Sequence, residues 1–226
     1  MISAAEGQIL ATSFSVAARA VTCCLPLAIL CAFCLSRRFP GKVVLDGLVH
    51  LPIILPPVLT GFLLLMLFGR RGPIGAWLAQ AGIHLIFTRQ GAALATAVMI
   101  FPVFVRSIRL AFEAIDGNLF EAASVLRAGP LDRFSSIAIP LAGPGILAGA
   151  VMAFATALGE FGAVITFAAN IPGQTQTLPL AIYAALQQPG GDAQAMRLAA
   201  LSFALAMAGL AAAALLQRWA VRRLAG

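Results

Sequence analysis

Long apolar stretches without a charged residue are the feature that most limits how this chain can fold. Two of them, residues 47–69 and 134–159, contain no Asp, Glu, Lys or Arg. A helix of roughly 20 apolar residues is long enough to cross a bilayer. Only 10% of the chain is charged, whereas soluble domains carry about 25%. We therefore predict an all-α fold, a polytopic bundle of membrane helices that occupies residues 1–226 as a single domain.

The gaps between charges predict about five membrane spans, and a sixth is left open. Arg19 interrupts the first span, where its long side chain either reaches an interface or faces a polar partner. Three prolines in Leu51–Pro57 should bend or break the second span. Residues 178–186 are too short to cross, and residues 74–85 resemble a helix that lies in the interface. The spans are expected at 10–35, 47–69, 90–105, 134–169 and 198–217.

The basic residues flank these spans and give the expected orientation. The formal net charge is +7, but the arginines are scattered between apolar runs, so membrane topology accounts for them better than nucleic-acid binding does. Loops on the cytoplasmic side are enriched in Lys and Arg. An amino end outside and a carboxyl end in the cytoplasm place most of the basic residues inside. We therefore expect a multi-pass protein of the bacterial inner membrane in this orientation.

The chain lacks the residues that several classes of enzyme require. Its only lysine is Lys42, and no glycine-rich phosphate loop precedes it, so the chain is not itself a P-loop ATPase. The four cysteines lie in one apolar run with no histidine near them in sequence, so no metal site is predicted. Only Arg19 and Glu160 are charged well inside the spans. A membrane enzyme needs a cluster of titratable residues, so it is kept only as an alternative, together with a stand-alone channel.

Residues 113–140 form the one segment between two predicted spans that looks soluble. Leu119, Ala122, Ala123 and Leu126 have the spacing i, i+3, i+4 and i+7, which predicts a short amphipathic helix. Such a helix either lies on the lipid surface or docks into a groove of a cytosolic partner.

The ends of this helix are also marked in the sequence. Asn118 is expected to cap its start, because Glu121 follows at the third helical position. Gly129–Pro130 is expected to end it.

The same segment resembles the loop by which importer-type ATP-binding-cassette permeases contact their ATPase. The family has Glu-Ala-Ala, then a glycine, then Ile-x-Leu-Pro, and this chain has Glu121-Ala122-Ala123 and Ile137-x-Ile139-Pro140. It departs at Arg127, where the family usually has glycine, and Gly129 is expected to supply the turn instead. A passive channel needs no such docking helix. The resemblance implies that contacts with the ATPase involve Leu119, Glu121, Ala122, Ala123, Leu126 and Gly129.

Other segments are similar to the molybdate permease subunits of this family, over essentially Leu25 to Arg223. The segments that carry the similarity are His50–Gly61, Gly69–Gly75, Leu158–Phe167 and Asn170–Pro179. Tungstate and sulfate permeases are near relatives and stay as alternatives, although sulfate permeases are generally longer at the amino end. The resemblance implies a type I importer fold, a homodimer, two cytosolic ATPase subunits that hold ATP and magnesium, and an external oxyanion-binding protein. It implies no cofactor on this chain.

Two segments are candidates for the pathway or its gate. The proline-broken second span should expose backbone groups and small residues, which suit an oxyanion better than a tight cage would. Simple helix packing accounts for the same residues equally well. Glu160 would repel an anion, so it is interpreted as a structural or gating residue that pairs with another group, for instance an arginine. The candidates are Pro56, Pro57, Thr60, Gly61, Gly159, Glu160 and Phe161.

Overall fold

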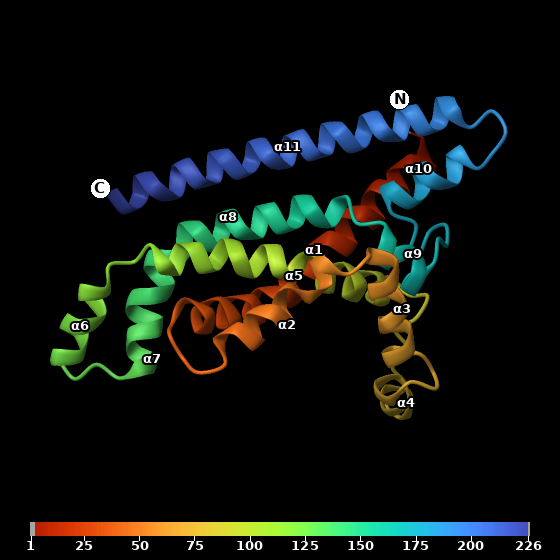
Figure 1. Ribbon diagram of the computed structural model, residues 1–226. Coiled ribbons are helices and arrows are strands. Elements are labelled where there is room, and N and C mark those ends of the chain that lie inside the picture. The colour runs from red at the N-terminus through yellow and green to blue at the C-terminus, as the bar shows by residue number, and fades with distance from the viewer. Residues whose placement is uncertain (1–2, 226) are drawn as a thin grey trace.

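The computed structural model describes residues 3–225, with side chains up to residue 215 except at residue 213. These residues form an all-helical bundle in which long helices run side by side and short ones gather at the two ends (Figure 1). The longer helices are α1 (Ala4–Ser36), α2 (Lys42–Ile54), α3 (Pro57–Phe68), α5 (Arg89–Glu113), α8 (Ile139–Leu158) and α11 (Asp192–Ala225). The short ones are α4 (Pro73–Gln80), α6 (Gly117–Val125), α7 (Pro130–Arg133), the π-helical turn Phe134–Ala138, α9 (Gly162–Ala168) and α10 (Leu178–Leu186).

Four helical segments are long and apolar enough to cross a membrane, and the bent pair α2–α3 makes five if it counts as one span. The described helices therefore agree with the prediction of about five spans only when the bent pair is counted as one crossing. The helices extend beyond the apolar runs, because polar residues at their ends continue and cap them. At the start of α1, for example, Ser3 and Glu6 form a reciprocal capping box. The start of α1 and the end of α11 lie at opposite ends of the bundle (Figure 1).

The second span is broken, as its prolines predict. The chain bends by 110° between α2 and α3, around Leu55 and Pro56. Pro56 and Pro57 have no amide hydrogen, so they cannot continue the hydrogen bonding of α2. As a result, α3 leaves the bundle and runs across its end (Figure 1).

The predicted fourth span, 134–169, is wrong beyond Leu158. Helix α8 ends there, the chain turns through Gly159–Phe161, and α9 begins at Gly162 in another direction. The apolar run continues because α9 is itself buried, against α3 and α5. Hydrophobicity alone does not distinguish one long helix from two buried shorter ones.

Helices α4 and α10 lie at the end of the bundle far from α6, and their bounds agree in part with those predicted from the sequence. Helix α10 has the predicted bounds, residues 178–186, and is too short to cross a membrane. The interfacial helix predicted at 74–85 is shorter, because α4 ends at Gln80 and Gly82 adopts a left-handed conformation with φ of 72°.

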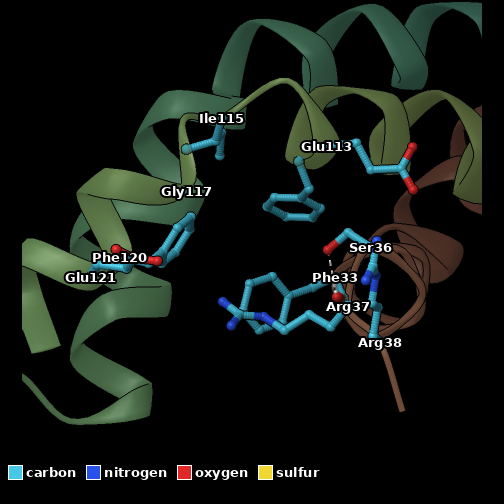
Figure 2. Close-up of a pocket in the computed structure, with 10 residues that line it drawn as sticks. Phe33, Ser36, Arg37, Arg38, Glu113, Ile115, Gly117, Phe120 and Glu121 are labelled. Carbon is cyan, nitrogen blue, oxygen red and sulfur yellow. Dashed lines mark hydrogen bonds between the residues drawn. The ribbon is translucent and has the colours of Figure 1, made fainter. Parts of the chain in front are cut away.

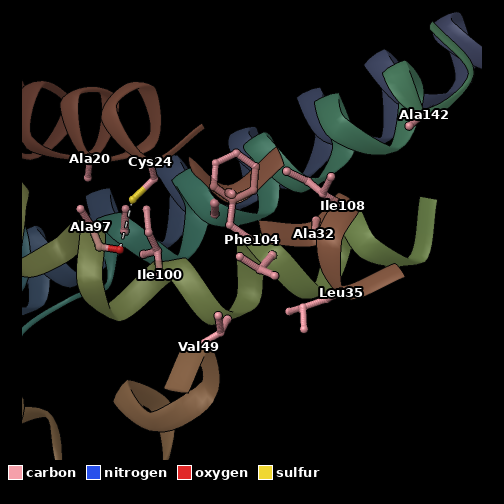
Figure 3. Packing of buried hydrophobic residues seen from close by; sticks show 14 of the residues in the cluster. Ala20, Cys24, Ala32, Leu35, Val49, Ala97, Ile100, Phe104, Ile108 and Ala142 are labelled. Carbon is pink, nitrogen blue, oxygen red and sulfur yellow. Dashed lines mark hydrogen bonds between the residues drawn. The ribbon is translucent and has the colours of Figure 1, made fainter. Parts of the chain in front are cut away.

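The main core lies between α1, α5 and α8 (Figure 3). Helix α1 contributes small buried side chains, which allow the helix backbones to approach closely. Larger side chains of α5, such as Ile100 and Phe104, fill the space opposite. The Cys24 thiol donates a hydrogen bond to the Ala97 carbonyl at 3.4 Å, so this cysteine joins α1 to α5.

Candidate functional site

The segment predicted to contact an ATPase lies at the end of the bundle away from the amino terminus (Figure 1). Its helix, α6, begins at Gly117, and the predicted cap at Asn118 is wrong. Asp116 is the N-cap instead, and its Oδ1 accepts a hydrogen bond from the Asn118 amide at 3.0 Å. Asp116 is the better placed of two good capping residues, because its extended backbone leaves its carboxylate facing the first free amides.

The end of α6 is a Schellman motif centred on Arg127. The Ala128 amide donates to the Ala123 carbonyl at 2.9 Å, and the Arg127 amide donates to the Ser124 carbonyl at 3.0 Å. This motif needs a left-handed residue, and Arg127 supplies it with φ of 61°. Gly129 has φ of −67°, so the predicted turn at Gly129 is wrong. The turn stays where the family usually has glycine, and the arginine adopts the strained conformation.

The leucine and valine side chains of this segment are exposed. No residue of α6 is buried, and Leu126 is 82% exposed. Leu119, Glu121 and Ala122 are also exposed, while Ala123 is half-buried. Val125 and Leu131 are 83% and 81% exposed. The sequence pattern misses these two, because Val125 falls outside the helical spacing and Leu131 follows the turn.

A cavity of about 530 Å³ separates α6 from the end of α1 (Figure 2). Both acidic and basic side chains line it, among them Arg37, Arg38, Glu113 and Glu121. Phe120 and Glu121 are the α6 side chains that line it, and the Phe120 ring packs against the main core (Figure 2).

A charged cluster that the sequence pattern does not predict lies beside this cavity. The Arg109 guanidinium contacts Asp46 Oδ1 at 3.0 Å and Glu113 Oε1 at 2.7 Å. It therefore ties α2 to the end of α5. The ion pair with Glu113 could be predicted from the sequence, because Glu113 is four residues from Arg109 on one helix. The ion pair with Asp46 could not, because Asp46 is far away in the sequence.

The two candidate pathway segments lie against each other. Helix α3 crosses α9, and each helix contributes a glycine to the contact. A Cβ atom on Gly61 would lie 2.7 Å from the Ala163 carbonyl oxygen and 2.8 Å from Thr166 Cβ. A Cβ atom on Gly162 would lie 2.6 Å from Pro57 Cβ. Side chains at either glycine would force the helices apart.

Most polar groups at this crossing form hydrogen bonds with residues near them in the sequence. The Glu160 carboxylate accepts a hydrogen bond from the Ala163 amide at 3.1 Å, so it caps the start of α9. No ion pair joins Glu160 to an arginine within residues 3–215, so the suggested arginine partner is not found there. The buried Thr60 hydroxyl has no hydrogen-bond partner among the described groups.

The remaining candidates shape the backbone around this crossing. Pro56 precedes α3 as its N-cap residue, and Gly159 ends α8. The Phe161 ring packs on Tyr183 of α10, with ring centroids 5.2 Å apart. The assignment of these positions to the pathway stays a prediction. In the described part of the chain, no three His, Cys, Asp or Glu side chains come together as a metal site would need.

Comparison with known proteins gives consistent matches over nearly the whole chain. A family described as binding-protein-dependent transport system inner membrane component matches residues 24–226. The chain is 49% identical over 219 residues to the molybdenum transport system permease protein ModB of Escherichia coli strain K12, covering 96% of this chain and 94% of that protein. It is 46% identical over 214 residues to ModB of Haemophilus influenzae, covering 94% and 92%.

The fold is also similar to that of a solved transporter. A chain of a bacterial alginate ABC transporter, in complex with an alginate pentasaccharide-bound periplasmic protein, matches with a TM-score of 0.74 and 16% identity. The match covers 93% of this chain and 77% of that one. At this identity the likeness concerns the fold.

Proposed function

This chain belongs to the family of binding-protein-dependent transport system inner membrane components, and we propose that it forms the membrane pathway of an ATP-driven molybdate importer. The observation that carries the proposal is the near-full-length similarity to molybdenum transport permeases. The chain is then a permease subunit, and ATP and magnesium bind to separate ATPase subunits. A tungstate or sulfate importer is the alternative.

The assembly that fits this role is a homodimer of the chain with two cytosolic ATPase subunits and an external oxyanion-binding protein. Helix α6 supports the ATPase contact, because its exposed leucine and valine side chains leave an apolar face unpaired within residues 3–215. The end of the bundle that carries α6 also carries Arg37, Arg38 and Lys42, which the positive-inside rule assigns to the cytoplasm. The amino end is then outside.

Transport follows from movement of the docked helix. ATP binding draws the two ATPase subunits together, and each carries an α6 with it. The spans change from inward-open to outward-open, because ATP binds one arrangement of the assembly more tightly than the other. Hydrolysis returns the assembly to its first state.

The crossing of α3 and α9 is the candidate pathway wall. An oxyanion needs hydrogen-bond donors that hold it weakly enough for release. The Thr60 hydroxyl lies at this crossing and is unused. Glu160 bears a charge of the wrong sign to bind an anion, and its carboxylate already caps α9, so its proposed role is structural or gating.

Uptake by reconstituted vesicles tests the substrate. The vesicles contain this chain, its ATPase and its binding protein, and labelled molybdate is supplied with unlabelled sulfate or tungstate as competitor. We expect ATP-dependent uptake that excess sulfate leaves nearly unchanged. If sulfate at the same concentration as unlabelled molybdate lowered the uptake equally, the molybdate assignment would fail.

Co-purification with the ATPase tests the docking surface. Leu126→Asp should abolish ATPase binding without unfolding the permease, since the Leu126 side chain is 82% exposed. Glu121→Ala should weaken binding. Asp192→Ala, which removes an acid at the opposite end of the bundle, is the matched control. Undiminished ATPase binding by Leu126→Asp would show that α6 lies on lipid or is idle.

A further inference from the structure

Helix α6 makes few contacts with the rest of the chain. None of its nine residues is buried. Its Ser124 hydroxyl accepts a hydrogen bond from Arg133 at 3.2 Å, but that bond links α6 to α7, which belongs to the same projecting segment. The contact with the bundle is made by Phe120, whose half-buried ring points toward the end of α1 (Figure 2).

Arg37 occupies the space between Phe120 and α1. Its guanidinium carbon lies 5.0 Å from the centroid of the Phe120 ring and 4.5 Å from that of the Phe33 ring. A guanidinium is attracted to the face of an aromatic ring at such distances. One cation therefore bridges a ring of α1 and a ring of α6.

The backbone explains why Arg37 can reach both rings. Arg37 is the C-cap of α1, with extended φ and ψ of −100° and 162°. Its side chain leaves the end of the helix and folds back over Phe33, one turn earlier. Acidic side chains, Glu113 and Glu121, line the same cavity and favour a cation there.

Phe33 is itself fixed by the two ends of the projecting segment. Its ring makes edge contacts with Phe112, just before that segment, at 5.4 Å between centroids, and with Phe134, just after it, at 4.6 Å. The ring that receives Arg37 is therefore held by α5, α1 and the turn that leads into α8.

We propose that Arg37 is a positioning residue that joins α6 to the first span, so that movement of α6 moves α1. The inference rests on the proposed function, in which a docked ATPase displaces α6. Without the bridge, the ATPase would still bind α6 and hydrolyse ATP, but less of each displacement would reach the spans. Loss of the bridge should therefore reduce transport per ATP more than it reduces hydrolysis.

The test measures ATP hydrolysis and anion uptake in the same vesicles of the full complex. Arg37→Ala and Phe120→Leu should each lower the anion taken up per ATP by about two- to fivefold, the factor expected for losing an exposed cation–π contact with the Phe120 ring. Phe120→Tyr keeps the ring and should keep the ratio. Arg38→Ala removes a neighbouring cation that has no ring contact among the described residues, and it should also keep the ratio.

The outcomes separate this inference from the proposed function. Hydrolysis and uptake that fall in equal proportion in Arg37→Ala would overturn it, and so would a Phe120→Leu ratio equal to that of Phe120→Tyr. If the unmodified complex imports sulfate instead of molybdate, the same ratios are measured with sulfate, and the bridge is tested while the molybdate assignment fails. ATPase that still binds Leu126→Asp would reject the docking surface independently.

Discussion

Replacing Gly61 by alanine should show how closely α3 depends on α9. The added Cβ would lie 2.7 Å from the Ala163 carbonyl oxygen and 2.8 Å from Thr166 Cβ. Carbon contacts are comfortable at about 3.5–4.0 Å, so α3 must move by roughly 1 Å. Overpacking of this kind costs about 1–3 kcal/mol of folding free energy.

A matched glycine separates this packing cost from helix propensity. Gly47 is also inside a helix, α2, and a Cβ there would have no neighbour within 4 Å. Both alanine variants gain about 1 kcal/mol of helix propensity. The difference between Gly61→Ala and Gly47→Ala is therefore the cost of separating α3 from α9.

The assay is thermal unfolding of the purified permease in detergent, followed by the loss of the monodisperse fraction. For a chain of this size, 1 kcal/mol shifts the midpoint by about 2–4 °C. Gly61→Ala should therefore unfold roughly 2–12 °C below Gly47→Ala. Equal midpoints within 1 °C, the resolution assumed for the assay, would refute the argument that glycine is required at this crossing.

Two further substitutions test local features of the site. Arg127→Gly should stabilise the end of α6 by about 0.5–1 kcal/mol, because an L-residue with left-handed backbone costs more than the extra chain entropy of glycine; slower amide hydrogen exchange in residues 117–128 measures it, and unchanged or faster exchange contradicts it. Glu160→Ala should lower stability by about 1 kcal/mol by removing the cap of α9, while Glu160→Gln keeps an oxygen for the Ala163 amide. Equal midpoints of thermal unfolding for the alanine and glutamine variants would show that the cap contributes nothing.

Features that depend on neighbouring residues could be predicted from the sequence. The spans follow from the absence of charge, the break between α2 and α3 from its prolines, and the bounds of α10 from an apolar run between polar loops. The existence of α6 follows from the i, i+3, i+4 spacing of its apolar residues. All of these patterns are read from residues that are close together in the sequence.

Features that depend on three-dimensional contact could not be predicted. Nothing near Gly61 indicates that it meets α9, about a hundred residues later in the sequence. The end of α8 at Leu158 could not be predicted for the same reason, because the buried helices on either side of the turn are equally apolar. At Asp116 and Asn118 two good capping residues compete, and the path of the chain leaving α5 decides between them. At Arg127 the Schellman hydrogen bonds outweigh the poor fit of arginine to a left-handed backbone.

The elbow between α2 and α3 has a consequence for the cost of bending. In a continuous helix, a change of angle must break hydrogen bonds between successive turns. At this elbow, Pro56 and Pro57 have no amide hydrogens to lose, and Leu55 already has an extended backbone. The bend of 110° can therefore change by rotation about a few bonds, with the hydrogen bonds inside α2 and α3 left intact. Helix α2 is held to α5 through Asp46, and α3 packs on α9, so a change of this bend would move α5 and α9 relative to each other.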